Sequence, residues 1–284
     1  MSGLKDLLRT ENLSRADVEL ILATAADFAK DPLKHSSSLA HKTVAIYMTK
    51  PSTRTRLASE TAVAHLGGTP IFLRGDELQI GRGETIDDTA RIVSQFCAAL
   101  IIRTYAQSDV DQLGKYASIP VINALTDEDH PTQLLADWMV IREKFGKEIA
   151  GRKFVYVGDG NNVANSWLLM GAIMGAHVVA ATPSGKFALA EDVVTKAKSV
   201  AAAIVSNASA RVSAFDTRVK STGWLCGLST ETSSWRLSAG VTDDPSTLEE
   251  ISDGPMPSNR SPRAPCLQGS HSASKTNPSG GSKR

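Results

Sequence analysis

The sequence is poor in cysteine, and the cysteines that it has form no recognisable pattern. Its 284 residues include three, Cys97, Cys226 and Cys266. This odd number excludes a framework of paired disulfides, and the wide spacing excludes a cysteine-based metal site. We therefore expect a protein of a reducing compartment.

The chain also has almost no excess of either charge. It carries 31 Lys and Arg against 30 Asp and Glu, a formal net charge of +1. Nothing global therefore favours nucleic acid or a membrane surface as a partner, and any anion site must be local. No apolar run approaches the length of a membrane span, and residues 1–8 are too short and too polar for a signal peptide. These absences predict a cytoplasmic protein.

What the sequence does contain is an alternation of short apolar runs with segments of helical period. The first helix is expected to begin after Ser14 and to end at Asp31. Further helices are expected over 57–66, 85–96, 109–116, 132–145 and 188–203, and one more follows residue 160 and ends at 174. Strands are expected over 43–48, 69–73, 98–102 and 119–122, from 153, and over 176–181. This alternation is typical of α/β proteins with parallel sheets covered on both faces.

One short stretch, residues 51–56, joins an apolar strand to a helix and is rich in hydroxyl and guanidinium groups. Ser52, Thr53 and Thr55 supply hydroxyl donors, while Arg54 and Arg56 supply charged forks suited to phosphate oxygens. A helix start after a strand points free N–H groups at an anion, so the stretch predicts a phosphate site. The alternative is an ordinary capped helix with a solvated pair of arginines.

Polar residues also follow two other predicted strands, at the edge where ligands of parallel sheets bind. Arg103 could place a second fork on the same phosphate or on a neighbouring carbonyl oxygen. His130 could donate a hydrogen bond to that carbonyl, and Gln133 offers both a donor and an acceptor. A lone histidine is more often structural, but the His-Pro-Thr-Gln context favours the functional interpretation.

Further motifs follow in order at 78–91, 102–104, 123–133 and 158–162. Together with Ser52-Thr53-Arg54-Thr55-Arg56, they resemble the aspartate/ornithine carbamoyltransferase family, and the ornithine branch in particular, over roughly residues 1–200. The resemblance implies two doubly wound α/β domains, a homotrimer, and no metal or organic cofactor. It also implies transfer of a carbamoyl group from carbamoyl phosphate to the side-chain amine of ornithine, giving citrulline and phosphate, a step of arginine biosynthesis.

The resemblance also assigns roles to individual residues. It implies that Arg103 and His130 are catalytic, that Gln79 reaches a neighbouring subunit's site, and that Asn162 contacts ornithine. The residues implied to bind carbamoyl phosphate are Ser52, Thr53, Arg54, Thr55, Gln79, Arg103, His130 and Gln133. For Asn162, a helix N-cap is an equally good interpretation. The Gly158-Asp159-Gly160 segment is not a dinucleotide fingerprint, because Val163 stands where the third glycine should be.

The pattern fails after about residue 205. Ser makes up about one in five of the later residues, and Pro and Gly gather toward the end, as in a chain that buries no core. We expect a carbamoyl-phosphate-binding domain over 1–146, the start of an ornithine-binding domain over 147–205, and a disordered or aberrant tail over 206–284. A reading-frame shift or an unusual terminal exon would produce such a tail, and a divergent but folded tail is the alternative.

The family's motifs for the second substrate are not found in this sequence. The ornithine enzymes carry a Ser-Met-Gly loop and a His-Cys-Leu-Pro motif, whereas Cys266-Leu267 here has neither the preceding His nor the following Pro. Carbamoyl transfer by this chain is therefore doubtful. The alternatives are a putrescine carbamoyltransferase and a non-catalytic remnant that binds carbamoyl phosphate.

Overall fold

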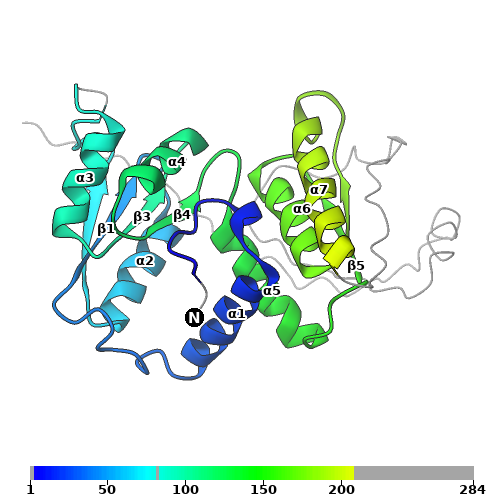
Figure 1. The fold of residues 1–284 in the computed structure, drawn as a ribbon, viewed down its shortest axis with the longest axis horizontal. Coiled ribbons are helices and arrows are strands. Elements are labelled where there is room, and N and C mark those ends of the chain that lie inside the picture. Colours follow the sequence, from blue (N-terminus) through cyan, green and yellow to red (C-terminus); the bar gives the residue numbers. More distant parts are fainter. Residues whose placement is uncertain (1–2, 81–82, 208–284) are drawn as a thin grey trace, which may run out of the picture. The chain divides into compact units, whose positions relative to one another are not determined.

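The computed structural model describes residues 3–80 and 83–207 (Figure 1). Of the two compact units of the chain, Met1–Val241 contains all of these residues. The second, Thr242–Arg284, lies outside them, as does nearly all of the predicted tail. The helices are α1 (Arg15–Lys30), α2 (Thr53–His65), α3 (Ile86–Phe96), α4 (Gln107–Tyr116), α5 (Pro131–Phe145), α6 (Asn162–Met174) and α7 (Glu191–Asn207), with 3-10 turns η1 (Thr10–Asn12) and η2 (Gly185–Phe187). The strands are β1 (Thr43–Met48), β2 (Thr69–Arg74), β3 (Ala99–Arg103), β4 (Val121–Leu125), β5 (Lys153–Val157) and β6 (His177–Ala181).

The first sheet has the strand order β2-β1-β3-β4, and all of its pairs are parallel. The register pairs Met48 at the end of β1 with Arg74 of β2 and with Arg103 of β3. A parallel order brings all carboxyl ends to one edge, so the segments that follow β1, β3 and β4 are neighbours. The predicted α/β class with parallel sheets is confirmed.

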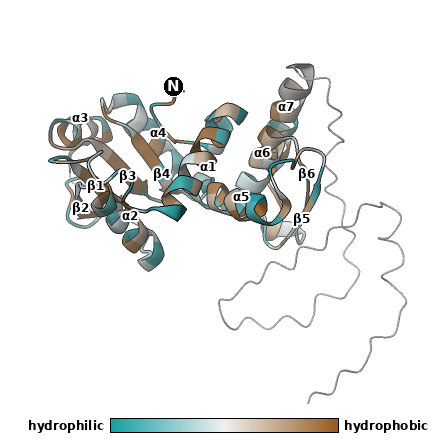
Figure 2. Cartoon of the chain, turned by 90° about the horizontal axis from the view of Figure 1, so that it is seen from below, coloured by the Kyte–Doolittle hydropathy of each residue, from teal (hydrophilic) through white to brown (hydrophobic). Residues whose placement is uncertain are grey.

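Both faces of this sheet are covered. Every residue of β1 from Val44 to Met48 is buried, which requires packing on each side of the strand. Ala90 of α3 and Leu113 of α4 join Ala45, Tyr47 and other strand residues in one apolar cluster. Helix α2 contacts β1 and β2, and Figure 2 shows it on the opposite side of the strands from α3 and α4.

Local sequence explains the first helix. Ser14 and Asp17 form a complete capping box, in which each side chain accepts the other residue's backbone N–H. The helix ends at Lys30 with Asp31 as its C-cap, because the following Pro32 disfavours helical geometry at Asp31. Val18 and Leu22 are buried. The predicted bounds of this helix are confirmed.

Several predicted boundaries were wrong, among them those of α7, which covers 191–207 rather than 188–203. Helix α2 begins at Thr53 rather than at residue 57, because Ser52 caps it and the hydroxyl-rich stretch becomes its first turn. Strand β4 covers 121–125 rather than 119–122. Its polar Asn123 is fully buried, and its amide nitrogen donates to the Leu8 carbonyl at 2.9 Å and to Gln107 Oε1 at 3.3 Å. Its Oδ1 has no hydrogen-bond partner among the described residues.

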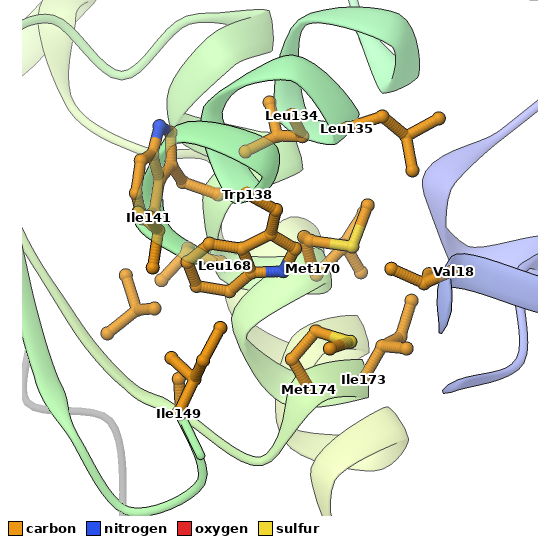
Figure 3. Packing of buried hydrophobic residues seen from close by; sticks show 14 of the residues in the cluster. Val18, Leu134, Leu135, Trp138, Ile141, Ile149, Leu168, Met170, Ile173 and Met174 are labelled. Carbon is orange, nitrogen blue, oxygen red and sulfur yellow. The ribbon is translucent and has the colours of Figure 1, made fainter. Parts of the chain in front are cut away.

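The second sheet in the described part of the chain pairs β5 with β6 in parallel. Helix α6 lies between them in sequence, and Gly175, at φ 70°, ends the helix in the left-handed conformation that glycine adopts most easily. A large apolar cluster contains residues of α1, α5 and α6, with Trp138 at its centre (Figure 3). In the described residues, none of the helices combines the length and apolar character that crossing a membrane would need.

Candidate functional site

The first turn of α2 is one wall of the candidate site. Ser52 is its N-cap, with φ −163° and ψ 115°, and its Oγ accepts the Thr55 N–H at 3.3 Å. The first N–H groups of a helix have no partner within the helix, and the helix dipole is positive at this end. Thr53 and Arg54 lie in this turn. The turn therefore combines N–H groups, hydroxyls and a guanidinium, which are the donor types that bind an anion at a helix start.

Arg103 is the last residue of β3 and connects that strand end to α2. Its Nε donates to the Lys50 carbonyl at 3.2 Å, and its Nη1 donates to Thr55 Oγ1 at 3.4 Å. The pairing of Arg103 with Met48 explains this contact, because it sets the end of β3 beside the β1–α2 connection. Two predicted phosphate ligands, Thr55 and Arg103, are thus in direct contact.

The charge of this wall is not compensated within the described residues. There, neither Arg54 nor Arg103 forms an ion pair with a carboxylate. Burial, and then the positive charge of Arg54, lower the pKa of Arg103 from its usual value. Both effects disfavour a charged guanidinium, and a bound anion would relieve them.

Arg56, in the same turn, is engaged elsewhere. Its Nε donates to Glu60 Oε1 at 2.9 Å, and its guanidinium carbon lies 3.8 Å from the centre of the Phe72 ring. An ion pair at this i,i+4 spacing together with a stacked aromatic ring accounts for its charge. The two arginines of the turn therefore differ in their availability to a ligand.

His130 stands after β4 at the start of α5. It is the N-cap residue, with φ −137° and ψ 67°, and Pro131 occupies the first helical position. Burial, and then the charge of Arg103, lower the pKa of His130 from 6.5 to about 4, so the imidazole is neutral at pH 7. Thr132 Oγ1 lies 3.3 Å from His130 Nδ1. A neutral imidazole keeps one N–H donor, as polarising a carbonyl oxygen requires.

Gln133 and Gln79 are exposed, and each bonds to a residue near it in sequence. The exposed Gln133 donates from Nε2 to Asp137 Oδ1 at 2.9 Å. Burial raises the pKa of the Asp137 carboxyl. Gln79 is also exposed, and its carbonyl accepts the Glu84 N–H at 3.4 Å. In the part of the chain that the structure describes, no hydrogen bond joins Gln79 to Arg103 or His130.

Asn162 does not cap α6. The N-cap is Asn161, whose Oδ1 accepts the Val163 N–H at 3.0 Å and the Ala164 N–H at 3.2 Å, so the N-cap interpretation of Asn162 was wrong. The physical reason is that the helix begins at Asn162 itself. Asn162 Nδ2 donates to the Thr126 carbonyl at 2.6 Å, and its Oδ1 accepts the Val163 N–H at 2.9 Å.

Sequence reasoning missed a buried polar group beside His130. Thr10, Asp129 and Ser166 are each buried and are joined by hydrogen bonds. They stand 119 and 37 positions apart in sequence. Asp129 had one available signal, a carboxylate directly before the candidate histidine, whereas Thr10 and Ser166 had none.

A second missed contact lies near the strand ends. Lys50 Nζ pairs with Asp127 Oδ1 at 2.5 Å and lies 5.1 Å from the centre of the Tyr105 ring. Lys50 follows β1 and Asp127 follows β4, so the pair joins two segments that flank Arg103.

The donor set suits an anion rather than a metal. Among residues 3–80 and 83–207, no group of three or more His, Cys, Asp or Glu side chains is arranged to hold a metal ion. A hollow of about 170 Å³ occurs elsewhere, between η1, the loop after β4, α6 and α7. Neither Ser52, Arg103 nor His130 lines it.

Two family models match this chain. The model for the carbamoyl-P binding domain of aspartate/ornithine carbamoyltransferases matches residues 5–143. The model for the Asp/Orn binding domain of the same proteins matches residues 150–222. Together they cover most of the described residues.

Individual proteins and structures agree. The chain is 49% identical over 183 residues to an ornithine carbamoyltransferase of Pyrococcus horikoshii, covering 64% of this chain and 57% of that protein. Over 195 residues it is 46% identical to one from Oceanobacillus iheyensis, covering 63% and 60%. It is similar in structure to the Pyrococcus furiosus enzyme, with TM-score 0.67, 44% identity and 74% and 65% coverage. It is also similar to the structure of the Thermus thermophilus enzyme, with a TM-score of 0.64 and 34% sequence identity, covering 69% of this chain and 68% of that chain. The chain thus spans less than two thirds of the length of these curated relatives.

Proposed function

This chain belongs to the aspartate/ornithine carbamoyltransferase family, and we propose that it binds carbamoyl phosphate at the carboxyl ends of β1, β3 and β4. The proposal assigns residues 1–146 to this substrate and residues 147–205 to the start of the domain for the second one. The proposed ligands are Ser52, Thr53, Arg54, Thr55, Gln79, Arg103, His130 and Gln133.

One observation carries the proposal. Arg103 donates to Thr55 in the first turn of α2, close enough to Arg54 for the two charges to disfavour each other, and within the described residues neither arginine has a carboxylate partner. Two unneutralised guanidiniums at a helix N-terminus are stabilised by a phosphate, which accepts bidentate hydrogen bonds from each.

The carbamoyl group would lie toward α5. His130, neutral at pH 7, would donate to the carbonyl oxygen and stabilise the negative charge that builds there when an amine attacks. Gln133 would accept from the carbamoyl amide through Oε1, because its Nε2 is held by Asp137. The exposed Gln79 would complete the site of a neighbouring subunit in a homotrimer.

We propose ornithine as the amine, giving citrulline and phosphate, with Asn162 as its contact. The sequence contains neither the Ser-Met-Gly nor the His-Cys-Leu-Pro motif, so we expect weak transfer. Both polar ends of the Asn162 side chain are engaged, with Thr126 and with the Val163 N–H. This favours the second candidate, a chain that binds carbamoyl phosphate with little or no transfer. Putrescine remains the alternative amine.

Two neighbouring arginines make a sharp test. Arg54→Ala should weaken the binding of carbamoyl phosphate by about 1.5–3 kcal/mol, the size of a hydrogen bond to a charged group. Arg56→Ala is the matched control, because Arg56 is already paired with Glu60, and we expect little change. Isothermal titration calorimetry on the full chain measures both. Equal losses, or unchanged affinity in Arg54→Ala, would contradict the assignment.

A further inference from the structure

One face of α6 binds the loop that carries His130. Asn162 Nδ2 donates to the Thr126 carbonyl at 2.6 Å, and Asn165 Nδ2 donates to the Glu128 carbonyl at 3.0 Å. Ser166 Oγ then accepts the His130 backbone N–H at 2.8 Å. Residues at i, i+3 and i+4 lie on one helix face, so α6 holds the main chain of residues 126–130 at successive points.

Ser166 is the most enclosed of these contacts. Its side chain is fully buried, and besides accepting from His130 it lies in hydrogen-bond contact with Asp129 Oδ1 and 2.8 Å from the Asn162 carbonyl. The Asp129 carboxylate is fixed in turn by the Thr10 N–H at 2.5 Å and the Thr10 hydroxyl at 2.7 Å. A buried network of this kind holds each member rigidly, because an unpaired polar atom is costly there.

The apolar core sets where Ser166 stands. Trp167, the next residue of α6, packs against Trp138 of α5 with ring centres 5.2 Å apart and planes 75° apart. Leu168, Met170, Ile173 and Met174 of α6 belong to the same apolar cluster as this tryptophan (Figure 3). The hydroxyl that meets His130 is therefore anchored by a closely packed helix pair.

We propose that Ser166 is a positioning residue, which orients His130 toward the carbonyl group of carbamoyl phosphate. The inference rests on the proposed function, since it takes His130 to contact that carbonyl. His130 is an N-cap residue with ψ 67°, and the bond from its N–H to Ser166 is the one that its own helix does not supply. Losing that bond lets the residue rotate and moves the imidazole from the carbonyl, while the phosphate ligands on α2 and β3 stay in place.

Two ligands separate positioning from general damage. Inorganic phosphate probes only the α2 and Arg103 wall, whereas carbamoyl phosphate also probes His130. Ser166→Ala should weaken carbamoyl phosphate binding to the full chain by about tenfold, equivalent to one lost hydrogen bond, and leave phosphate affinity within about twofold. A merely structural role would weaken both ligands alike, and that result would overturn the inference.

The chain offers a matched control. Ser94 of α3 also accepts a backbone N–H from another segment, that of Ser118 at 3.1 Å, and donates to the Ala90 carbonyl at 2.7 Å. It lies in none of the proposed contacts. Ser94→Ala should leave the ratio of the two affinities unchanged, and an equal change in both serine variants would overturn the inference.

A third variant distinguishes this failure from failure of the proposed function. His130→Ala should lower carbamoyl phosphate affinity about tenfold without affecting phosphate. If it does so and Ser166→Ala does not, the positioning role is wrong and the site stands. If His130→Ala leaves the ratio unchanged, the proposed contact of His130 with the carbonyl is wrong, and the positioning role falls with it.

A milder variant covers the case in which Ser166→Ala fails to fold. Asn165→Ala removes only the half-exposed bond to the Glu128 carbonyl. It should lower the affinity for carbamoyl phosphate about threefold, less than a full hydrogen bond, with phosphate affinity unchanged. An unchanged ratio here would count against α6 as the element that positions the loop.

Discussion

The two parallel sheets in the described part of the chain differ in the residues at the carboxyl ends of their strands. In the first sheet, the ends of β1, β3 and β4 lead to Ser52, Arg103 and His130. Among the described residues, neither Arg54 nor Arg103 at this edge has a carboxylate partner. In the second, β5 leads to Asn161 and Asn162, whose side chains already bind main-chain groups of the protein. One edge is left with unsatisfied charge and the other is internally satisfied.

The difference explains why the first edge, and not the second, is proposed as the substrate site. Both edges carry polar residues at helix starts, and both helices are capped by a side chain. Only the first brings two like charges together, the exposed Arg54 and the partly buried Arg103, and a bound anion would offset the repulsion between them. This residual charge, rather than the mere presence of polar residues, is the reason for proposing the first sheet as the binding region.

The largest expected effect concerns transfer itself. If residues 147–205 supply no amine site, citrulline formation at saturating carbamoyl phosphate and ornithine should stay near background. Positioning two reactants is worth roughly 7–11 kcal/mol, and a free amine is mostly protonated at neutral pH. A steady-state assay with ornithine, putrescine and aspartate measures this. Turnover of about 10 per second, a typical enzyme rate, would contradict the absence of an amine site.

A smaller effect tests the environment of His130 through stability. Its folded pKa, about 4, lies below the ordinary 6.5, so the unfolded chain binds more protons between these values. Stability should therefore rise from pH 4 to pH 6.5, by at most about 3 kcal/mol from this residue. His130→Asn should remove that part of the slope in urea unfolding. An identical slope in the variant would show that His130 is not held in its neutral form.

Much of the first region could be predicted from the sequence. The positions of the strands could be predicted because apolar runs stop at polar residues. This prediction placed Ser52, Arg103 and His130 at one edge of the first sheet. The start of α2 was misplaced because a Ser-capped turn and a loop have similar composition. The end of β4 was missed because Asn123 is polar, and its partners, Leu8 from the start of the chain and Gln107 from α4, are not evident from its local sequence.

The contacts that α6 and Thr10 make with the loop of residues 126–130 could not be predicted. Thr10, Asp129 and Ser166 come from separate elements, and nothing in their local sequences indicates that they meet. The roles of Gln79 and Asn162 rest on the family resemblance and stay predictions. The predicted tail, residues 206–284, lies almost entirely outside the described residues.

The smallest effect compares the two helix caps. Ser52→Ala and Asn161→Ala each remove a side-chain acceptor from a helix start, and each should cost about 1 kcal/mol of unfolding free energy. Only Ser52→Ala should also weaken phosphate binding, because only α2 borders the unneutralised arginines. Thermal unfolding and phosphate titration of both variants check this. Similar losses of phosphate affinity in the two variants would contradict the distinction between the two sheets.

The central claim, that the anion site lies at the first sheet and not at the second, is tested most directly by titrating phosphate into two arginine variants. Arg103 and Arg152 each donate from Nε to a main-chain carbonyl, of Lys50 at 3.2 Å and of Glu148 at 3.0 Å, but only Arg103 ends a strand of the first sheet. Arg103→Ala should weaken phosphate binding by about 1.5–3 kcal/mol, tenfold or more, and Arg152→Ala should leave it unchanged. Unchanged binding in Arg103→Ala, or an equal loss in Arg152→Ala, would contradict the account.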